Sequence, residues 1–393
     1  MIRLDVWLTL PDGKNVLCGE LAFSDPDTRG SYRSAFRYTA AYLAHPLAFP
    51  LDPVALPLEG TEWETERLTA PLMIFEDALP DDWGRKLLIR RAALPRAEQG
   101  PPYLLRALDN SGMGALAFLP PGTQWQPRQP HDYELQELHH AVQQYEQGHH
   151  DDGSDDGYMA LLYAGSSPGG ARPKALIRDQ YGEWLAKFPS IKDQVDMVGL
   201  EAATLELGRQ AGLVIPESKI VQLGENRRAL LVKRFDLTPE GGRRHMMSFQ
   251  TALAATGWYV VGYKDLLDWI RKHGSRPGGD APALFRWMVF NAMVKNTDDH
   301  LKNFWLLGGP DGYELAPSFD LLPNVNDNQE HVLNFDLNPT IKREALADLG
   351  RKWGIARSRS IVEEVRGVMP QYAGIAENFG VPERDIARFC CSS

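Results

Sequence analysis

Apolar and polar residues alternate near the start of the chain, and a period of two is typical of strands with one buried face. The alternation runs from Leu4 to Leu10, Pro-Asp-Gly at 11–13 indicates a turn, and the apolar stretch 18–23 follows it. Together these features predict a hairpin. A second apolar stretch, 46–58, is broken repeatedly by proline, which predicts an edge-like or irregular segment.

Helical spacing first appears after Asp81 and ends at Pro95. A glycine-flexed turn that leads into a short buried strand is expected at 110–120, and an amphipathic helix at 131–147. The following stretch, 149–157, is rich in charge and glycine and has the composition of a linker. This part of the chain therefore mixes helices with strands.

A second strand-rich unit extends to about residue 236, and the pattern turns helical from about residue 245. The unit contains one helical stretch, at 197–212. Strand-like stretches lie on either side of it, at 175–179, 183–189, 219–224 and 228–236. The helical part has apolar residues at helical spacing at 246–257, 263–274 and 281–296. We therefore predict an α+β fold, a strand-rich half followed by a helical half, with a ligand cleft between them.

The composition is that of a globular protein with an acidic balance. Of 393 residues, 43% are hydrophobic, and 42 Lys and Arg stand against 52 Asp and Glu, a net charge of −10. These values exclude a mostly disordered chain and disfavour direct binding to DNA or RNA. Three cysteines without a Cys-x-x-Cys pair disfavour a disulfide framework and a thiolate zinc site. The lack of a leader-like start and of a bilayer-length apolar stretch predicts a cytoplasmic protein.

The most informative polar cluster is Asn-Thr-Asp-Asp-His at 296–300, directly after an apolar helical run. Asp298 and Asn303 lie five positions apart. This is the spacing of the protein-kinase catalytic loop, where the Asp orients the substrate hydroxyl and the Asn holds a magnesium ion. A structural alternative is that Asn296 or Thr297 simply caps a continuing helix.

A second acidic motif, Ser-Phe-Asp-Leu-Leu-Pro at 318–323, follows an apolar segment and contains Asp320. Kinases carry Asp-Phe-Gly at the matching stage, and its carboxylate binds the magnesium that bridges the nucleotide phosphates. Mg²⁺ prefers oxygen ligands, so a carboxylate, an amide and phosphate oxygens suit it. A turn capped by the Asp is the alternative, and the order of the two motifs favours the metal site.

A loop with few large side chains contains Ser166, Ser167, Gly169 and Gly170, and Lys174 follows it. Its backbone N–H groups would suit phosphate oxygens. The loop has neither the Walker spacing nor the G-x-G-x-x-G spacing. An ordinary surface loop therefore stays open as an alternative.

Lys187 lies in an apolar, strand-like run between Trp184 and Phe188. A buried ammonium group needs a counter-charge, because burying it unpaired is costly. Nucleotide phosphates are one candidate partner, and Glu201 on the following helix is another. A lysine that faces water from an edge strand is the alternative.

The end of the strand-rich half is a candidate hinge. At 230–236 the backbone is expected to meet an adenine ring. We interpret the side chains of Lys233, Arg234 and Asp236 as a surface charge cluster.

These pieces, in this order, resemble the HipA family of bacterial toxin kinases over nearly the whole chain. The most specific parts are Asn-Thr-Asp-Asp-His-x-Lys-Asn at 296–303 and Ser-Phe-Asp-Leu-x-Pro at 318–323. The supporting parts lie at 77–88, 112–120, 165–177, 232–237 and 243–250. The resemblance implies a bilobal protein-kinase-like fold made of an N-terminal HipA-type subdomain at 1–125, an N-lobe-like region with a phosphate loop at 126–238, and an all-helical C-terminal lobe at 239–393.

The resemblance also implies roles for individual residues. Asp298 matches the family's catalytic aspartate, and Asn303 and Asp320 match its magnesium ligands. Lys187 matches its nucleotide-phosphate lysine. The spacing to Asn303 favours Asp298 as the catalytic residue, with the neighbouring Asp299 as the alternative.

Further roles follow from the same resemblance. Ser167, or the neighbouring Ser166, matches the serine that family members autophosphorylate, a modification that switches the kinase off. The other residues expected to contact ATP are Gly169, Gly170, Ala171, Lys174, Lys233, Phe235, His300 and Lys302.

The implied activity is that of a serine/threonine protein kinase toxin that uses ATP and Mg²⁺ and phosphorylates an aminoacyl-tRNA synthetase. A small DNA-binding antitoxin of the HipB type is the implied partner, so DNA would be contacted only through that partner, and no membrane is involved. The residues leave two other functions open. One is a kinase for a small-molecule acceptor, and the other is a nucleotide-binding, non-catalytic partner of a transcriptional repressor.

Overall fold

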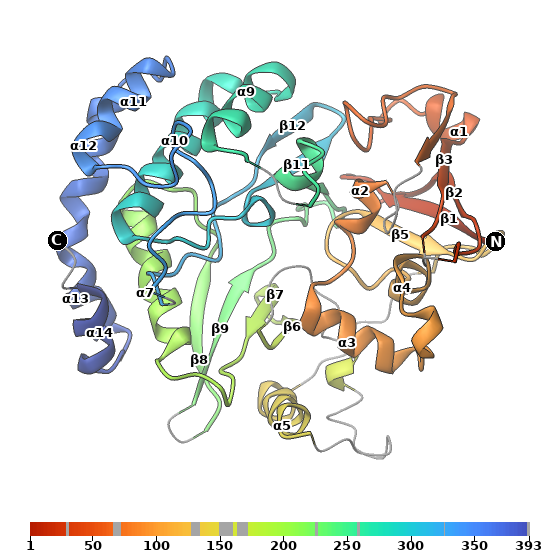
Figure 1. Cartoon of the computed structure of the whole chain (residues 1–393). Helices are drawn as coiled ribbons and strands as arrows, with labels where there is room; N and C mark the ends of the chain where they lie inside the picture. The colour runs from red at the N-terminus through yellow and green to blue at the C-terminus, as the bar shows by residue number, and fades with distance from the viewer. Residues whose placement is uncertain are drawn as a thin grey trace.

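The computed structural model describes residues 1–28, 31–65, 72–126, 134–148, 160–162, 172–224, 227–257, 260–325 and 327–390. The two termini lie on opposite sides of the molecule, with the N-terminal sheet at one side and the last helices at the other (Figure 1). Two further sheets, of four and three strands, lie between them.

The N-terminal region is built around an antiparallel sheet of five strands in the order β4-β3-β2-β1-β5. The strands are β1 (Ile2–Thr9), β2 (Asn15–Phe23), β3 (Ser34–Tyr38), β4 (Glu62–Thr65) and β5 (Leu116–Leu119). The predicted hairpin is confirmed as β1 and β2, and alternate residues such as Leu4 and Val6 are buried. The fully described stretch 46–58 is irregular apart from a bridge between Asp52 and Leu56, as its prolines predict.

Short helices accompany this sheet and connect it to the rest of the chain. They are α1 (Ala40–Leu43), α2 (Met73–Glu76), α3 (Asp82–Arg91), η1 (Arg96–Glu98) and α4 (Pro101–Leu108). The predicted helix after Asp81 is confirmed as α3. Asp77, which ends α2, accepts hydrogen bonds from the backbone N (2.7 Å) and Oγ (2.8 Å) of Ser248, far along the chain. The Asp77 carboxyl group, which links the two regions, is buried, and burial raises its pKa to about 6.

The middle region contains an antiparallel sheet in the order β6-β7-β9-β8 and a long helix beside it. The elements are α5 (Leu135–Glu146), β6 (Lys174–Asp179), β7 (Gly182–Lys187), α7 (Met197–Gln210), β8 (Ser218–Gln222) and β9 (Arg228–Lys233). The strands and helices predicted from the sequence are confirmed here. Asp196 caps α7 by accepting from the Gly199 N–H, and α7 packs against β8 and β9. This packing brings one face of the sheet against a single helix.

The C-terminal region is mainly helical, but it also holds a small sheet. Its elements are β10 (His245–Ser248), α8 (Phe249–Ala252), α9 (Tyr263–His273), α10 (Pro277–Val294), η2 (Leu301–Asn303), β11 (Trp305–Gly309), β12 (Gly312–Leu315), η3 (Arg343–Ala345), α11 (Leu346–Lys352), α12 (Ser358–Val368), η4 (Met369–Gln371), α13 (Tyr372–Asn378) and α14 (Glu383–Cys390). The sheet β10-β11-β12 departs from the all-helical lobe expected from the sequence. Its strands were missed because they are short, and β11 is buried along its whole length, so it shows no alternation.

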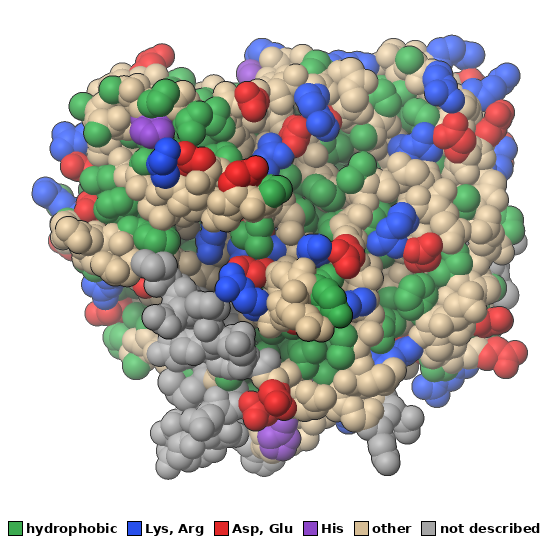
Figure 2. Space-filling model, turned by 180° about the vertical axis from the view of Figure 1, so that it is seen from behind, with side chains coloured by type: hydrophobic (Ala, Val, Ile, Leu, Met, Phe, Trp, Pro, Cys, Tyr) green, Lys and Arg blue, Asp and Glu red, His purple; other side chains and the backbone are tan. Residues whose placement is uncertain are grey.

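Figure 2 shows the molecule from behind, relative to the view of Figure 1. On that face, basic and acidic side chains are interspersed among neutral ones. That face therefore has no single sign of charge, in keeping with the nearly balanced but acidic composition. Within the described ranges, no helix combines the length and the apolar character needed to cross a membrane.

Candidate active site

Lys187 stands at the centre of the cleft between the middle and C-terminal regions. Lys187 belongs to β7, which lies between β6 and β9. Only 15% of the Lys187 side chain is exposed. The ammonium Nζ lies 2.5 Å from Glu201 Oε1 on α7 and 2.6 Å from Asp320 Oδ1. The predicted partner Glu201 is confirmed, and the alternative of a water-facing edge lysine is wrong because β7 is an inner strand.

The three charges change one another's protonation. Burial alone would lower the pKa of Lys187, but Asp320 and Glu201 outweigh it, and the pKa lies above its usual value. Burial alone would raise the pKa of Asp320, but Lys187 and the nearby Lys174 hold it well below its usual value. Burial raises the pKa of Glu201, and Lys187 opposes that rise only in part. Lys187 and Asp320 are therefore a charged pair at neutral pH.

Asp320 is held in an uncommon backbone conformation. Its φ is 55°, in the left-handed region that residues with a Cβ rarely adopt. The preceding Phe319 enters an apolar cluster, and the following Leu321 is buried in the main core. Packing on both sides thus fixes the carboxylate toward Lys187, and such local strain is concentrated at functional sites.

Asp298 presents a carboxylate to the cleft from the loop after α10. About two thirds of its side chain is exposed (66%), and its Oδ1 lies 3.8 Å from Nε2 of His300. Partial burial raises the pKa of Asp298, His300 opposes the rise, and the carboxylates of Asp320 and Asp299 add to it. The side-chain Nδ2 of Asn303 donates to the backbone carbonyl of Asp298 at 2.6 Å, which fixes the loop.

The neighbouring Asp299 points the other way and is buried. It accepts hydrogen bonds from Tyr263 Oη at 2.6 Å, from His331 Nδ1 at 2.8 Å and from the backbone N of Val332 at 2.8 Å. Asp299 therefore ties α9 and the loop around residue 331 to the loop after α10. Since its oxygens are occupied inside the protein, only Asp298 is available to a ligand.

The structural alternative for this loop, a helix capped by Asn296 or Thr297, is wrong. The helix α10 ends at Val294, and the next turn, η2, is a short 3₁₀ turn that begins after His300 without a side-chain cap. Asn296 donates to Asn291 Oδ1 at 3.2 Å instead. The segment after α10 is therefore not helical, and Asn296 ties it to α10.

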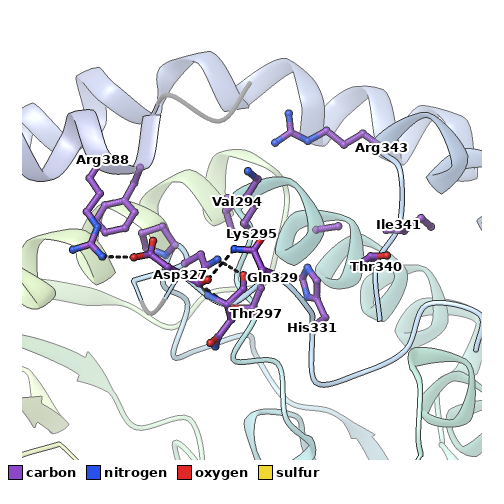
Figure 3. A pocket seen from close by; sticks show the side chains of 15 residues that line it. Val294, Lys295, Thr297, Asp327, Gln329, His331, Thr340, Ile341, Arg343 and Arg388 are labelled. Atoms are coloured by element: carbon purple, nitrogen blue, oxygen red, sulfur yellow. Dashed lines mark hydrogen bonds and ion pairs between the residues drawn. The ribbon is translucent and has the colours of Figure 1, made fainter. Parts of the chain in front are cut away.

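Two adjoining pockets meet at Lys187, which lines both. The polar pocket is lined by Arg172, Pro173, Lys174, Lys187, Phe188, Met197, Val198, Glu201, Asn296, Thr297, Asp298, Asp320, Leu322, Pro323, Asn324 and Val325. The apolar pocket is lined by Met113, Leu185, Lys187, Val232, Lys233, Arg234, Phe235, Met246, Trp305 and Phe319. A third pocket adjoins the polar one and shares Thr297, Pro323 and Asn324 with it (Figure 3).

The period of two along the strands explains how the sheet lines both pockets. Lys187 and Leu185 lie two positions apart on β7 and so share a face. In register, Lys187 pairs with Lys174 of β6, and Leu185 pairs with Val232 of β9. The face that meets the cleft thus has charged groups at one end of these strands and apolar groups further along.

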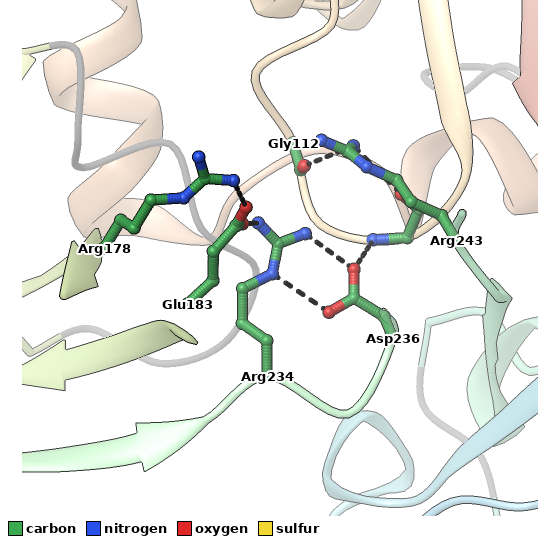
Figure 4. A network of polar contacts seen from close by, with 7 residues as sticks. Gly112, Arg178, Glu183, Arg234, Asp236 and Arg243 are labelled. Carbon is green, nitrogen blue, oxygen red and sulfur yellow. Dashed lines mark hydrogen bonds and ion pairs between the residues drawn. The ribbon is translucent and has the colours of Figure 1, made fainter. Parts of the chain in front are cut away.

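A buried polar network anchors the hinge to the N-terminal region (Figure 4). Arg234 is only 4% exposed and pairs with Asp236 through two hydrogen bonds of 3.0 and 2.7 Å. Asp236 also accepts from the backbone N of Gly114 at 2.7 Å, and Arg243 donates to the carbonyls of Gly112 and Gly114 at 3.2 Å. The loop that carries Met113 is therefore fastened to the hinge.

This network corrects the interpretation of the hinge side chains as a surface charge cluster. Arg234 and Asp236 are buried against the loop of another region, a contact that local sequence does not reveal. Only Lys233 fits the surface interpretation, since it is exposed enough to pair with Glu217 at 2.7 Å. The Lys233 ammonium is thus paired with Glu217 and not with the carboxylates around Lys187.

The other predicted residues are placed as follows. Lys174 is buried beside Lys187, and burial lowers its pKa to about 8 although Asp320 opposes the shift. Phe235 lines the apolar pocket and packs on Phe319, with ring centroids 5.5 Å apart. Lys302 Nζ lies 3.4 Å from Asp81 Oδ1 at the start of α3. Ser166, Ser167, Gly169, Gly170 and Ala171 lie outside the described residues.

The oxygen atoms of the site suit magnesium. The described residues hold no cluster of three or more Asp, Glu, His or Cys side chains that would bind a metal by themselves. Mg²⁺ needs fewer protein ligands, because it keeps waters and binds phosphate oxygens. Asn303 uses its Nδ2 on the Asp298 carbonyl, so its amide oxygen is not committed to that hydrogen bond, and Lys187 engages only Oδ1 of Asp320. Asn303 itself is buried, and it is not among the described residues that line the polar pocket.

Sequence reasoning missed most of the apolar pocket. Met113, Met246 and Trp305 come from three distant segments and form one cluster with Leu307 and Ala316. Nothing in a local pattern distinguishes them from ordinary core residues. Phe319 had a signal, because it directly precedes Asp320 in the motif.

Fold and site together define a class: a two-lobed, kinase-like protein with an additional N-terminal region. The HipA-like C-terminal domain matches residues 166–373, more than half of the chain, and the HipA N-terminal domain matches residues 12–119. The chain therefore belongs to the HipA family, as the motifs predicted.

Individual relatives agree with this assignment. The chain is 31% identical over 217 residues to Y4dM of Sinorhizobium fredii, a protein named as a kinase, covering 48% of this chain and 51% of the relative. It is 24% identical over 336 residues to the serine/threonine-protein kinase toxin HipA of Shewanella oneidensis, covering 78% and 73%. The chain thus spans about half the length of Y4dM, the more similar of these two curated relatives.

A solved structure shares the fold along nearly the entire chain. It is the complex of HipA, HipB and operator DNA from Shewanella oneidensis, with a TM-score of 0.71 and 22% identity. The match covers 98% of this chain and 95% of that one. The predicted α+β, kinase-like fold is thereby confirmed.

Proposed function

We propose that this protein is a kinase that uses ATP and Mg²⁺ to phosphorylate a serine or threonine of another protein. The observation that carries the proposal is the position of Lys187, buried between Glu201 and Asp320 where the apolar and the polar pocket meet. Phosphoryl transfer needs positioning and charge neutralisation more than covalent chemistry. A lysine held at this junction supplies both.

The polar pocket would hold the phosphates and the metal. Lys187 and Lys174 supply two ammonium groups on neighbouring strands, paired in register. Asn303 and Asp320 would hold Mg²⁺, which neutralises charge on the phosphates when it is bound. Glu201 keeps Lys187 in place while the nucleotide enters. The His300 imidazole, 3.8 Å from the Asp298 carboxylate, would lie close to the transferred group.

Asp298 would orient the acceptor hydroxyl. Its carboxylate is exposed to the cleft, so an acceptor can reach it, and the Asn303 contact fixes its backbone. Holding the hydroxyl in line with the phosphate lowers the activation free energy of such reactions by several kcal/mol, on the order of 3 or more. The role requires position and a hydrogen bond, and not a strongly basic group.

The apolar pocket would hold the adenine ring. Val232 and Leu185 form one wall from the sheet, and Phe319 and Phe235 form another. Met113 completes it from the N-terminal region. An apolar slot with polar backbone at a hinge suits a flat, partly polar base.

The expected acceptor is an aminoacyl-tRNA synthetase, and the expected partner is a HipB-like antitoxin. Support for the partner is that the Shewanella protein of the same fold is found with HipB and operator DNA. A net charge of −10 favours contact with DNA through such a partner. Phosphorylation of Ser166 or Ser167 would add charge to the loop and displace it.

A transfer assay with γ-³²P-labelled ATP tests the proposal. The protein is incubated with a lysate and, separately, with its metabolite fraction, and Lys187→Ala is compared with Lys192→Ala, an exposed lysine outside the pockets. We expect label in a protein band for the wild type and Lys192→Ala but not for Lys187→Ala. Label only in a metabolite, or no ATP consumption at all, would favour the two other functions.

Mass spectrometry tests the regulatory part separately. Protein purified from an active strain should carry phosphate on Ser166 or Ser167, and the Asp320→Ala form should carry none. Phosphate on neither serine in active protein would remove autophosphorylation from the proposal while leaving the kinase intact.

A further inference from the structure

A second polar pocket opens directly beside the proposed phosphate site (Figure 3). Thr297, Pro323 and Asn324 line both pockets, and Thr297 Oγ1 lies 3.2 Å from Asn324 Oδ1. Asn324 Oδ1 also accepts a hydrogen bond from the backbone N–H of Asn328 at 3.0 Å. The two pockets are thus separated by one ordered wall, and Asp298 follows Thr297 directly in the chain.

The charged residues of this pocket are mainly basic. Lys295, Arg343 and Arg388 line it together with a single carboxylate, Asp327. Arg388 reaches from α14 to Asp327 at 2.8 Å, and Lys295 lies between Arg388 and Arg343 in Figure 3. His331 also lines the pocket, but its Nδ1 is bonded to the buried Asp299. In a protein of charge −10, a local excess of cations next to the acceptor site favours an anionic ligand.

Lys295 is the cation nearest in sequence to Asp298, three positions before it. It ends α10 in the left-handed conformation, with φ 56°, and its N–H closes the helix on Asn291 O. Glycine or asparagine is usual at such a position, because a Cβ is unfavourable there. Lys295 forms no ion pair with any described residue, so its ammonium is available to a ligand.

A structural role for Lys295 predicts a different outcome. A cation at the C-terminal end of a helix stabilises it modestly through the helix dipole. That role would make α10 less stable without Lys295, but it would not make the protein discriminate between acidic and neutral partners. Discrimination among ligands therefore separates the two interpretations.

We infer that this pocket binds an acidic side chain of the protein acceptor, within a few residues of the serine or threonine that is phosphorylated. An extended peptide advances about 3.3 Å per residue, so a chain whose hydroxyl lies at Asp298 can place a side chain a few positions away in the neighbouring pocket, which Thr297 also lines. The glutamate or aspartate would pair with Lys295 and be attracted by Arg343. The inference rests on the proposed kinase function and names the class of acceptor.

Peptides that differ by one charge test this inference with the full-length protein. Each peptide has one serine in a neutral sequence and carries Glu, or the uncharged Gln, at successive positions on either side of it. Binding is measured by fluorescence anisotropy and transfer by kcat/KM with labelled ATP. At one position, Glu is expected to improve binding and kcat/KM about fivefold over Gln, the size of a partly exposed ion pair.

Two charge reversals locate the effect. Lys295→Glu should abolish the preference for Glu, whereas Lys342→Glu, next to Arg343 but outside the pocket, should retain it. If Lys295→Glu does not fold, Lys295→Gln removes the charge without adding another and should also abolish the preference. Loss of the preference in both Lys295→Glu and Lys342→Glu would overturn the inference, because it would mean a general effect of surface charge.

The remaining outcomes keep this inference distinct from the kinase proposal. Tighter binding of the Glu peptides that depends on Lys295, without any transfer, would support the pocket and contradict the kinase. Transfer with equal binding and kcat/KM for Glu and Gln at every position would support the kinase and overturn the pocket. Lys295-dependent binding of a short single-stranded RNA in place of the Glu peptides would also overturn it, in favour of a nucleic-acid ligand.

Discussion

The two ends of the proposed nucleotide cleft are built in opposite ways. At the polar end, Lys187 lies between the carboxyl groups of Glu201 and Asp320, at 2.5 and 2.6 Å. At the apolar end, Met113, Phe235 and neighbouring apolar side chains form one packed cluster. The first arrangement positions reacting groups, and the second only encloses a surface.

The two ends are expected to determine different kinetic constants. Groups that stabilise developing charge act mainly in the transition state, so their loss lowers kcat. Groups that enclose an apolar surface bind ground state and transition state alike, so their loss raises KM. The two ends are therefore expected to respond differently to substitution.

The largest effect is expected at the polar end. Asp320→Ala and Asp298→Ala should each lower kcat by about 10³-fold or more, because each removes charge stabilisation or positioning at the reacting groups. The measurement is the initial rate of ³²P transfer to protein. Asp311→Ala, an exposed carboxylate at the turn after β11, is the matched control and should retain full activity. Near-normal transfer by either variant would contradict the assignment.

The second contrast is between neighbours, Asp298 and Asp299. Asp299→Asn should lower the free energy of unfolding by about 2–4 kcal/mol, because the donors from Tyr263, His331 and Val332 would meet an amide in place of the buried carboxyl group. Asp298→Asn should leave stability within about 0.5 kcal/mol, since its side chain is exposed. Urea unfolding of both variants gives the comparison. Equal stability of the two would show that Asp299 is not the structural member of the pair.

The apolar end should show a moderate effect on KM alone. Met113→Ala should raise the KM for ATP about fivefold with kcat unchanged, because part of one wall of the adenine site is lost. Met113→Leu keeps most of the volume and should remain close to the wild type. Steady-state kinetics at varied ATP measure both constants. A fall in kcat without a change in KM would place Met113 outside the adenine site.

The smallest expected effect is a pH dependence of nucleotide affinity. The pKa of Lys174 is lowered to about 8, so its amine is charged below pH 8 and neutral above it. The groups that face it are Asp320, Lys187, Asp81 and Glu201. Nucleotide affinity should therefore fall a few-fold, roughly threefold, as pH rises from 7 to 9. Titration of a fluorescent ATP analogue measures it, and Lys174→Met should flatten the curve. An unchanged slope in that variant would assign the effect to another group.

The two ends also differ in how far the sequence could predict them. The polar end was predictable because its residues lie in short motifs: Asp298 and Asn303 share one loop, and Asp320 has its own. The strands and α7 were predictable from their periodicity, and with them the position of Lys187. A buried lysine must have a partner, which made Glu201 a candidate as well.

The rest depends on contacts between distant segments. The loop that places Met113 at the cleft is bonded to Asp236 and Arg243, and no local pattern in the sequence indicates that contact. The strands of the small C-terminal sheet are too short, and β11 too fully buried, to alternate. The burial of Arg234 has the same cause, since the surface that covers it comes from another region.

The most direct measurement is a crystal structure of the protein with Mg²⁺ and a non-hydrolysable ATP analogue. The base is expected in the apolar pocket against Met113 and Phe235, with the phosphates at Lys187. The metal is expected on oxygens of Asn303 and Asp320. A nucleotide bound elsewhere, or a metal that contacts neither residue, would contradict the central claim.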